Sequence, residues 1–211
     1  MKHLIAWCID TLFPPHPDVV KARAVPAEEL CAGCTIRLDK KRRVYSALSY
    51  AKESVRALIR ANKYYADPHA ARLLSEVLGI IIETVLDERA LDSSWRRPLV
   101  VPMPASPKRL RERGYNQVAH IVEHLPLPGN FERSDALKRR HRESQTRVVK
   151  SKRAKNIAGA FYVPENAFHE VVGRSILLID DVCESGSTMK DATRALKEAG
   201  AREIVGIALA T

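Results

Sequence analysis

The stretch Ile176–Met189, ILLIDDVCESGSTM, constrains the fold of this chain more than any other. Its short, wholly apolar start is typical of a strand that is buried on both faces, as in a parallel sheet. The small and polar residues that follow predict a loop, and the helical spacing from Ser187 predicts a helix that Gly200 would end. A buried strand, a short loop and a helix in this order indicate an α/β fold.

The remaining apolar pattern predicts helices and strands that alternate along the 211 residues. One helical face begins near Ser46, and a longer one follows Asp67 and Pro68. Further predicted elements are a strand at 98–101, a helix at 114–125, and strands at 159–163 and 203–210. We therefore expect a Rossmann-like domain with a mostly parallel sheet.

The first 44 residues show no lasting apolar period, and four prolines interrupt them after residue 13. We expect a small irregular segment at 1–44 and an α/β domain at 45–211. Residues 130–165 are predicted to form a basic insertion, because nine Lys or Arg stand between Leu137 and Lys155 against Glu143 alone. Such a charge density attracts phosphates, pyrophosphate or a nucleic-acid backbone. The alternative is a solvated basic face.

The sequence predicts no membrane span, because no run approaches the roughly 18 apolar residues that a spanning helix needs. The stretch from Met1 to Pro15 also lacks the pattern of a signal peptide. We therefore expect a cytoplasmic protein.

The loop after the predicted strand is suited to a sugar phosphate. Ligands of parallel α/β sheets lie beyond the carboxyl ends of the strands, where Asp180 and Asp181 are expected. Gly186 lets the backbone approach a ligand closely, and the free N–H groups of the following helix bind phosphate. The hydroxyl donors of this loop are Ser185, Ser187 and Thr188. The acid pair would thus bind a ribose diol while the loop binds its 5′-phosphate; the alternative is an acidic strand end with an ordinary helix cap.

This stretch resembles the phosphoribosyl pyrophosphate (PRPP) motif of type I phosphoribosyltransferases, in which two acids and a Ser/Thr-Gly-x-Ser/Thr loop follow an apolar strand. Other stretches narrow the resemblance to the competence protein F-like (ComF/GntX-type) family. They are VRALIRANKY at 55–64, VPMPASPKRLRERGYNQ at 101–117, and RRHRESQ and KSKRAKNIAGAF within 139–161. The resemblance runs from about Tyr45 to the C-terminus.

The resemblance implies a set of site residues. The pyrophosphate loop would comprise Pro102, Met103, Pro104, Ala105 and Ser106, with Lys108 and Arg109 close behind it. A flexible loop closing over the ligand would carry Arg111, Arg113 and Tyr115. The basic insertion at 130–165 would form a hood-like element, and Mg²⁺ would bind together with PRPP.

Catalysis would rest on Asp180, Asp181 and Glu184. The ComF-like family more often has Thr at the position of Glu184, whereas purine-salvage transferases place an acid there. We hypothesise that Glu184 handles a proton on an acceptor base, the alternative being a side chain that only faces solvent.

The family usually carries two zinc-binding Cys pairs near the N-terminus, and the first pair is replaced here. Only Cys31 and Cys34 form a CxxC motif, so a four-ligand zinc site would also need Cys8 and His16. The alternative is a degenerate zinc-ribbon-like segment with free thiols.

Three functions are consistent with these residues. The first is a phosphoribosyltransferase (a glycosyltransferase) that passes the sugar phosphate of PRPP, or of a related ribose phosphate, to an acceptor. The second is a single-stranded DNA-handling protein of natural transformation, in which Arg139, Arg140 and Arg142 contact the phosphate backbone. The third is a PRPP-binding regulator without catalysis. The sequence leaves the acceptor and the oligomeric state open, and an oligomer is compatible with it.

Overall fold

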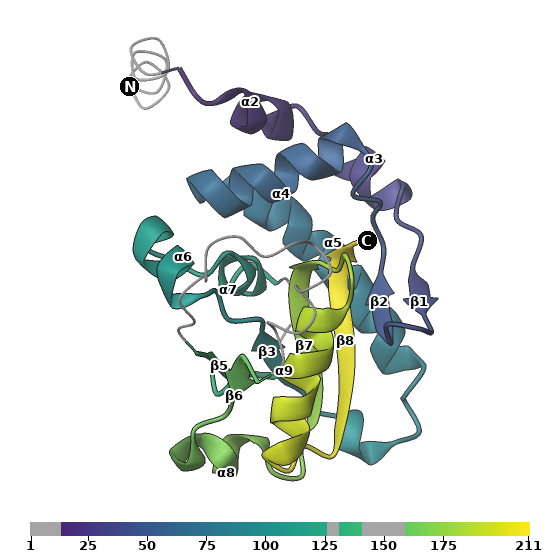
Figure 1. Cartoon of the computed structure of the whole chain (residues 1–211). Helices are drawn as coiled ribbons and strands as arrows, with labels where there is room; N and C mark the ends of the chain where they lie inside the picture. The colour runs from purple at the N-terminus through teal and green to yellow at the C-terminus, as the bar shows by residue number, and fades with distance from the viewer. Residues whose placement is uncertain (1–13, 126–130, 141–158) are drawn as a thin grey trace, which may run out of the picture.

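The computed structural model describes residues 14–125, 131–140 and 159–211, and it has an α/β fold built on a mostly parallel sheet (Figure 1). In this part of the chain the sheet order is β1-β2-β8-β7-β3-β4, and only β1 and β2 pair antiparallel. The strands are β1 Arg37–Asp39, β2 Val44–Ser46, β3 Leu99–Pro102, β4 Glu132–Arg133, β7 Ser175–Val182 and β8 Glu203–Ala210. This topology confirms the predicted fold class.

Helices cover both faces of the sheet (Figure 1). The helices are α2 Pro17–Arg23, α3 Ala27–Ala32, α4 Glu53–Tyr65, α5 Pro68–Asp87, α6 Pro107–Arg113, α7 Gln117–Val122, α8 Phe168–Val171 and α9 Ser187–Glu198. Short 3-10 turns lie at Ser93–Trp95 and Glu165–Ala167. Helix α9 packs on one face, and α5 lies behind the other and packs against α4 (Figure 1). A separate two-stranded sheet pairs β5 Lys138–Arg139 with β6 Phe161–Tyr162.

The long helix α5 forms where the apolar period predicted it. Asp67 caps its N-terminus by accepting a hydrogen bond from the backbone of Ala70 at 2.9 Å, and Pro68 occupies the first turn. Apolar side chains at helical spacing, among them Leu74, Leu78 and Ile81, are fully buried. Among the described residues, no helix combines the length and the apolar character that crossing a membrane would require.

The expectation of an irregular N-terminal segment is wrong for the described residues 14–44. This part holds α2, α3 and β1, and its last residue, Val44, begins β2. The prolines that suggested irregular backbone stand where helices tolerate them, because Pro17 occupies the first turn of α2 and Pro26 is the N-cap of α3. The domain boundary at residue 44 stays a prediction.

The first long helix begins later than its apolar pattern suggested. Helix α4 starts at Glu53, whereas Leu48 pairs with Ala210 beside β8. The backbone N–H of Leu48 donates to the carbonyl of Leu209 at 3.0 Å. Leu48 is buried by the sheet edge rather than by a helix face, and a spacing of three to four residues does not distinguish the two.

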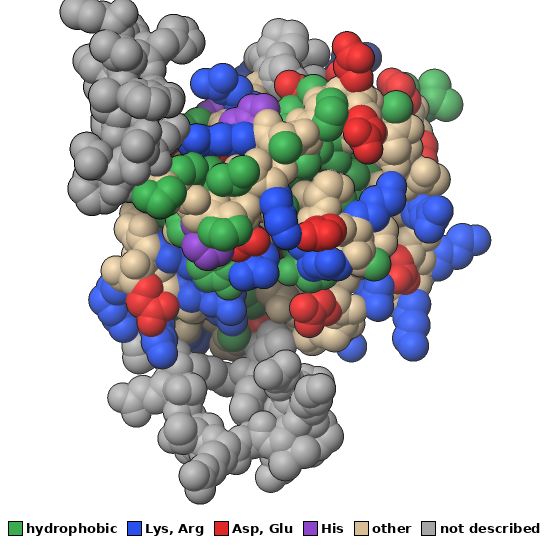
Figure 2. Space-filling model, turned by 90° about the horizontal axis from the view of Figure 1, so that it is seen from above, with side chains coloured by type: hydrophobic (Ala, Val, Ile, Leu, Met, Phe, Trp, Pro, Cys, Tyr) green, Lys and Arg blue, Asp and Glu red, His purple; other side chains and the backbone are tan. Residues whose placement is uncertain are grey.

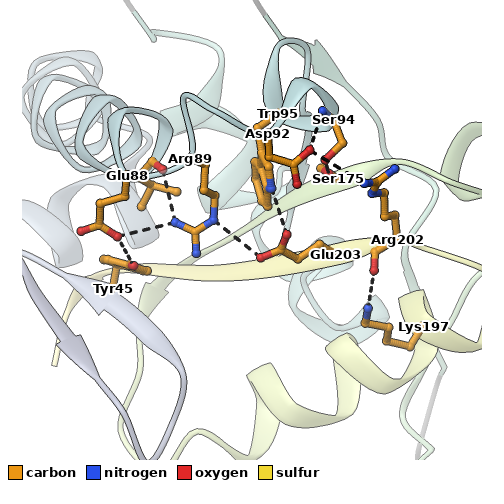
Figure 3. Close-up of polar contacts among 11 residues, drawn as sticks. Tyr45, Glu88, Arg89, Asp92, Ser94, Trp95, Ser175, Lys197, Arg202 and Glu203 are labelled. Carbon is orange, nitrogen blue, oxygen red and sulfur yellow. Dashed lines mark hydrogen bonds and ion pairs between the residues drawn. The ribbon is translucent and has the colours of Figure 1, made fainter.

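Arg89 joins three elements at the amino-terminal edge of the sheet (Figure 3). Its guanidinium forms ion pairs with Glu88 and Glu203, each at 3.6 Å. It also lies 5.8 Å from the ring centroid of Tyr45 and 5.1 Å from that of Trp95. The indole N–H of Trp95 donates to Glu203 at 3.0 Å, so the chain after α5, strand β2 and the start of β8 share one polar network.

Replacing Arg89 with Met should lower the free energy of unfolding by about 1–2 kcal/mol, since two partly buried ion pairs and two ring contacts are lost. Urea denaturation would measure the change. Arg96→Met is the matched control, because the Arg96 side chain is exposed and has no polar partner among the described residues. Equal losses in the two variants would contradict a stabilising role for this network.

Candidate functional site

The predicted ligand-binding segments meet at the carboxyl edge of the sheet. Strands β3 and β7 run parallel, with Pro102 opposite Ile179. The backbone N–H of Met103 donates to the carbonyl of Ile179 at 2.8 Å, which ties the start of the pyrophosphate loop to the end of β7. The structure therefore brings the proposed pyrophosphate loop, 102–106, beside the acid pair.

Asp180 and Asp181 lie within β7 itself, which continues to Val182 rather than ending at Ile179. Their side chains point to opposite faces because successive strand residues alternate. Asp181 is buried and accepts a hydrogen bond from the amide of Gln117 at 3.4 Å. Burial, and then the adjacent Asp181 carboxylate, raise the pKa of the Asp180 carboxyl well above its ordinary value. The two acids thus differ in environment although they are neighbours in sequence.

The loop after β7, predicted to bind phosphate, enters α9 at a glycine. Gly186 is the N-cap of α9 and has a φ of +74°, a left-handed conformation that glycine adopts without strain. The hydroxyl groups of Ser185 and Ser187 lie 2.7 Å apart. Thr188 follows in the first turn of α9, and Glu184 is exposed on the loop.

Arg42, which the sequence analysis did not single out, lies against this loop. A side chain at Gly186 would meet Cγ of Arg42 at 3.2 Å, and the Arg42 guanidinium pairs with Asp39 at 3.1 Å. Arg42 belongs to the turn between β1 and β2, where four basic residues stand in succession at 40–43. This basic run is visible in the sequence. Its position beside the loop after β7 is not, because it depends on the pairing of β2 with β8.

Arg111 and Arg113 are not on a loop as expected, because they occupy the last turn of α6. Ser106 caps this helix by accepting from the N–H of Arg109 at 3.3 Å, Pro107 fills its first turn, and Gly114 ends it with φ +79°. Lys108 and Arg109 lie in its first half. These local signals produce a short helix in place of the expected loop.

Tyr115, the third residue expected on the flexible loop, is half-buried and fixed to α4. Its hydroxyl donates to the carbonyl of Asn62 at 2.5 Å and accepts from the N–H of Ala66 at 3.0 Å. The expectation of a free loop residue is therefore wrong here, because two backbone groups hold the phenol in place.

The basic insertion contributes two cations above aromatic rings. Arg139 lies 5.2 Å from the centroid of Phe161, and Arg140 lies 4.5 Å from that of Tyr162. Burial, and then repulsion by Arg109, lower the pKa of Arg139. Arg142 lies outside the described residues.

The insertion is attached to the main domain through Asp191 of α9. Its carboxylate accepts from the backbone N–H groups of Gly159 and Ala160, each at 2.8 Å, and of Phe161 at 3.1 Å. These hydrogen bonds lower the pKa of Asp191 against the opposing effect of burial. Strand β6 is thereby held by the helix that begins at the phosphate loop.

A cavity of about 720 Å³ opens beside the pyrophosphate loop. Its lining comes from Pro102, Pro104 and Ala105 of that loop, from α6 and α7, and from the β5–β6 pair. From above, at the end of the molecule where β7 and β8 finish, Lys and Arg side chains appear interspersed with apolar ones and some carboxylates (Figure 2). The candidate site therefore combines acids, basic side chains and apolar walls.

The CxxC motif provides two thiols, but the described residues contain no complete zinc site. Within ranges 14–125, 131–140 and 159–211, no group of three or more His, Cys, Asp or Glu could hold a metal ion. Burial raises the pKa of both Cys31 and Cys34, and the Cys34 thiol donates to the carbonyl of Leu30 at 3.3 Å. His16 caps α2, and its ring stacks on that of Tyr65 with 4.8 Å between the ring centroids. Cys8 lies outside the described residues, and zinc binding stays a prediction.

Residues 111–211 match the phosphoribosyl transferase domain family. Competence protein ComFC of Streptococcus pneumoniae is 32% identical over 104 residues, which are 49% of this chain and 44% of that protein. ComFC of Bacillus subtilis is 33% identical over 102 residues, 48% of this chain and 39% of that protein. The matched part thus spans less than half of either relative. These findings confirm the ComF-like phosphoribosyltransferase fold that the sequence motifs resemble.

Solved structures show more distant similarity. A phosphoribosyltransferase from Corynebacterium diphtheriae is 18% identical with a TM-score of 0.37, covering 90% of this chain and 78% of that chain. A glutamine PRPP amidotransferase from B. subtilis, complexed with ADP and GMP, is 16% identical with a TM-score of 0.40, covering 71% of this chain and 30% of that one.

Asp180→Asn should raise the melting temperature at pH 7, because it removes a carboxylate whose charged form is destabilised in the folded state. Each kcal/mol of stability gained corresponds to a rise of about 2–4 °C. Between the unfolded pKa of about 4 and the raised folded pKa, the folded state binds more protons, so stability falls as pH rises. The gain should therefore shrink towards pH 4, where the native carboxyl is protonated. Thermal unfolding at pH 4 and pH 7 would measure it. A melting temperature unchanged or lowered at pH 7 would contradict the destabilising environment of Asp180.

Proposed function

We propose that this protein binds PRPP with Mg²⁺ at the carboxyl edge of β3 and β7 and transfers its phosphoribosyl group to an acceptor. One observation carries the proposal: the acid pair, the phosphate loop and the pyrophosphate loop lie together at one sheet edge. Sugar hydroxyls, a 5′-phosphate and a pyrophosphate need these three kinds of partner. The phosphoribosyl transferase domain match over 111–211 supports the same ligand.

The residues fit a magnesium ion that arrives with the ligand. Mg²⁺ prefers oxygen ligands and is commonly bound by one or two carboxylates together with substrate phosphates. Asp180 and Asp181 would supply or orient the protein oxygens, and the ligand's hydroxyl and pyrophosphate oxygens would complete the set. The ion would supply positive charge against the pyrophosphate.

The protein's part in the transfer would be positioning and electrostatic stabilisation. The acceptor's lone pair forms the new bond to the anomeric carbon, while the electrons of the broken carbon–oxygen bond leave with pyrophosphate. Lys108 and Arg109 of α6 would stabilise the negative charge of the departing group. Glu184, exposed on the phosphate loop, is our candidate for handling a proton of the acceptor.

Calorimetry with PRPP and Mg²⁺ tests the binding half of this proposal. The parent protein should bind, and Asp180→Asn combined with Asp181→Asn should weaken binding at least about tenfold, since charged hydrogen bonds to the ligand are lost. The control, Glu76→Gln combined with Glu83→Gln, removes two exposed carboxylates of α5 and should leave affinity unchanged. Equal affinity in all three proteins would refute the site.

Pyrophosphate release separates transfer from regulation. If PRPP binds but a panel of nitrogen acceptors releases no pyrophosphate, the protein is a PRPP-binding regulator and the transfer half of the proposal is wrong.

A second candidate function, single-strand nucleic-acid binding, is favoured by two exposed tyrosines at the end of α4. Tyr64 and Tyr65 are 52% and 44% exposed. The Arg113 guanidinium lies 4.9 Å from the Tyr64 ring centroid, and the Lys63 ammonium lies 5.9 Å from it. The exposed Tyr64 ring next to two cations is what base stacking and phosphate contact require, whereas the Tyr65 ring stacks on His16. The names of the two ComFC relatives support a role in competence.

Tyr64→Ala should weaken binding of oligothymidylate about tenfold, because stacking contributes roughly 1–3 kcal/mol per base. Neutralising Arg139, Arg140 and Arg142 should also flatten the salt dependence of binding. Fluorescence anisotropy over a salt series measures both effects, with Leu91→Ala as the exposed control. If Tyr64→Ala binds as tightly as the Leu91 variant, stacking at this position is excluded.

A further inference from the structure

The cavity beside the pyrophosphate loop has mostly apolar walls. Pro104, Leu110, Leu137 and the ring of Tyr162 are among the residues that line it. Three members of the pyrophosphate loop form part of its wall, so a molecule in the cavity would lie next to the segment proposed to hold pyrophosphate. Apolar walls of this kind suit an aromatic or heteroaromatic ring.

His120 provides a hydrogen-bond acceptor in the cavity wall. The amide nitrogen of Asn62 donates to the carbonyl of Gln117 at 3.0 Å, which fixes the orientation of that buried amide. The amide oxygen of Asn62 therefore lies 2.8 Å from Nδ1 of His120 and accepts a hydrogen bond from the N–H at that position. In the neutral ring Nε2 is then unprotonated, and among the described residues it has no hydrogen-bond partner.

The neutral form of His120 is favoured by its surroundings. Burial, and then the neighbouring His124, lower its pKa, with weaker opposing effects from Glu123 and Asp67. The rings of Tyr115 and His124 contact it edge-on, at centroid distances of 5.8 and 5.0 Å. The ring is thus held from several sides, and its acceptor nitrogen is fixed in place.

Arg139 provides a cation in the same wall that forms no ion pair with another described residue. The two carboxylates that line the cavity, Glu123 and Asp135, both pair with Arg133, at 2.9 and 3.5 Å. Within the described part of the chain, no carboxylate lies within ion-pair distance of Arg139, although its guanidinium is half-buried over Phe161. The cavity therefore has a place for a ligand's negative charge.

We propose that this cavity is the acceptor site, and that it takes a planar N–H heterocycle bearing a carboxylate. Arg139 pairs with the ligand's carboxylate, and Nε2 of His120 accepts a hydrogen bond from the ligand's ring N–H. Leu137 and Tyr162 contact the ring. That the ligand is an acceptor rests on the proposed function, whereas the binding site itself is inferred from the cavity alone. It names a substrate class that the sequence motifs leave open.

Orotate and uracil test this class, because they share a ring and differ by one carboxylate. Calorimetry on the full chain should show orotate binding at least tenfold more tightly than uracil. Arg139→Gln should reduce orotate affinity to that of uracil and leave uracil affinity unchanged. Arg96→Gln, a change of the same type at an exposed arginine outside the cavity, should alter neither.

The role of His120 has its own probe. His120→Leu should weaken both orotate and uracil about tenfold, and 1,3-dimethylorotate, which lacks both ring N–H groups, should bind the parent protein as weakly as orotate binds that variant. Circular dichroism of each variant would identify any that fails to fold. The dimethylated probe keeps the test valid in that case, because it needs only the parent protein.

The outcomes distinguish this inference from the proposed function. PRPP binding without preferential orotate binding overturns the acceptor assignment alone. Orotate binding that responds to Arg139→Gln, in a protein that does not bind PRPP, overturns the proposed function and leaves the cavity as a binding site. Equal affinity for dimethylorotate and orotate would remove His120 from the site.

Discussion

The parallel pairing of β7 with β3 on one side and β8 on the other is the constraint on which the rest of the structure depends. Ile176 to Ile179 are fully buried, so their side chains and backbone are fixed from both faces and both edges. Because parallel strands end at the same edge, this register sets where the acid pair stands relative to the pyrophosphate loop. The hydrogen bond from Met103 to Ile179 extends the pairing one residue into the loop.

The site is assembled at some cost to stability. Two adjacent carboxylates at the end of a buried strand repel each other, and burial disfavours the charged form of Asp180. A protein selected for stability alone would not place charges there. The proposed ligand, which brings hydroxyl groups and a cation, would account for their position, because it would stabilise in the complex the two charges that destabilise the free protein.

The sequence predicted the sheet, the long helices and the loop between β7 and α9 because each depends on local signals. The apolar run before Asp180, the cap at Asp67 and the glycine at 186 act within a few residues of themselves. It failed where one residue type has two roles: proline at 17 starts a helix instead of breaking the chain, and Leu48 is buried by a strand instead of a helix. Arg42 and His120 could not be found, since their neighbours at the site, Gly186 and Asn62, are distant in sequence.

The hairpin of β1 and β2 has a consequence for how this protein can be divided. Strand β2 runs from Val44 to Ser46 and covers the outer edge of β8, while the turn before it places Arg42 against Gly186. A fragment beginning at Tyr45 would cut β2, expose the hydrogen-bonding groups of β8 and leave the phosphate loop without its neighbour. Residues 45–211 alone would therefore lack part of the sheet edge and one neighbour of the loop after β7, both of which the hairpin supplies.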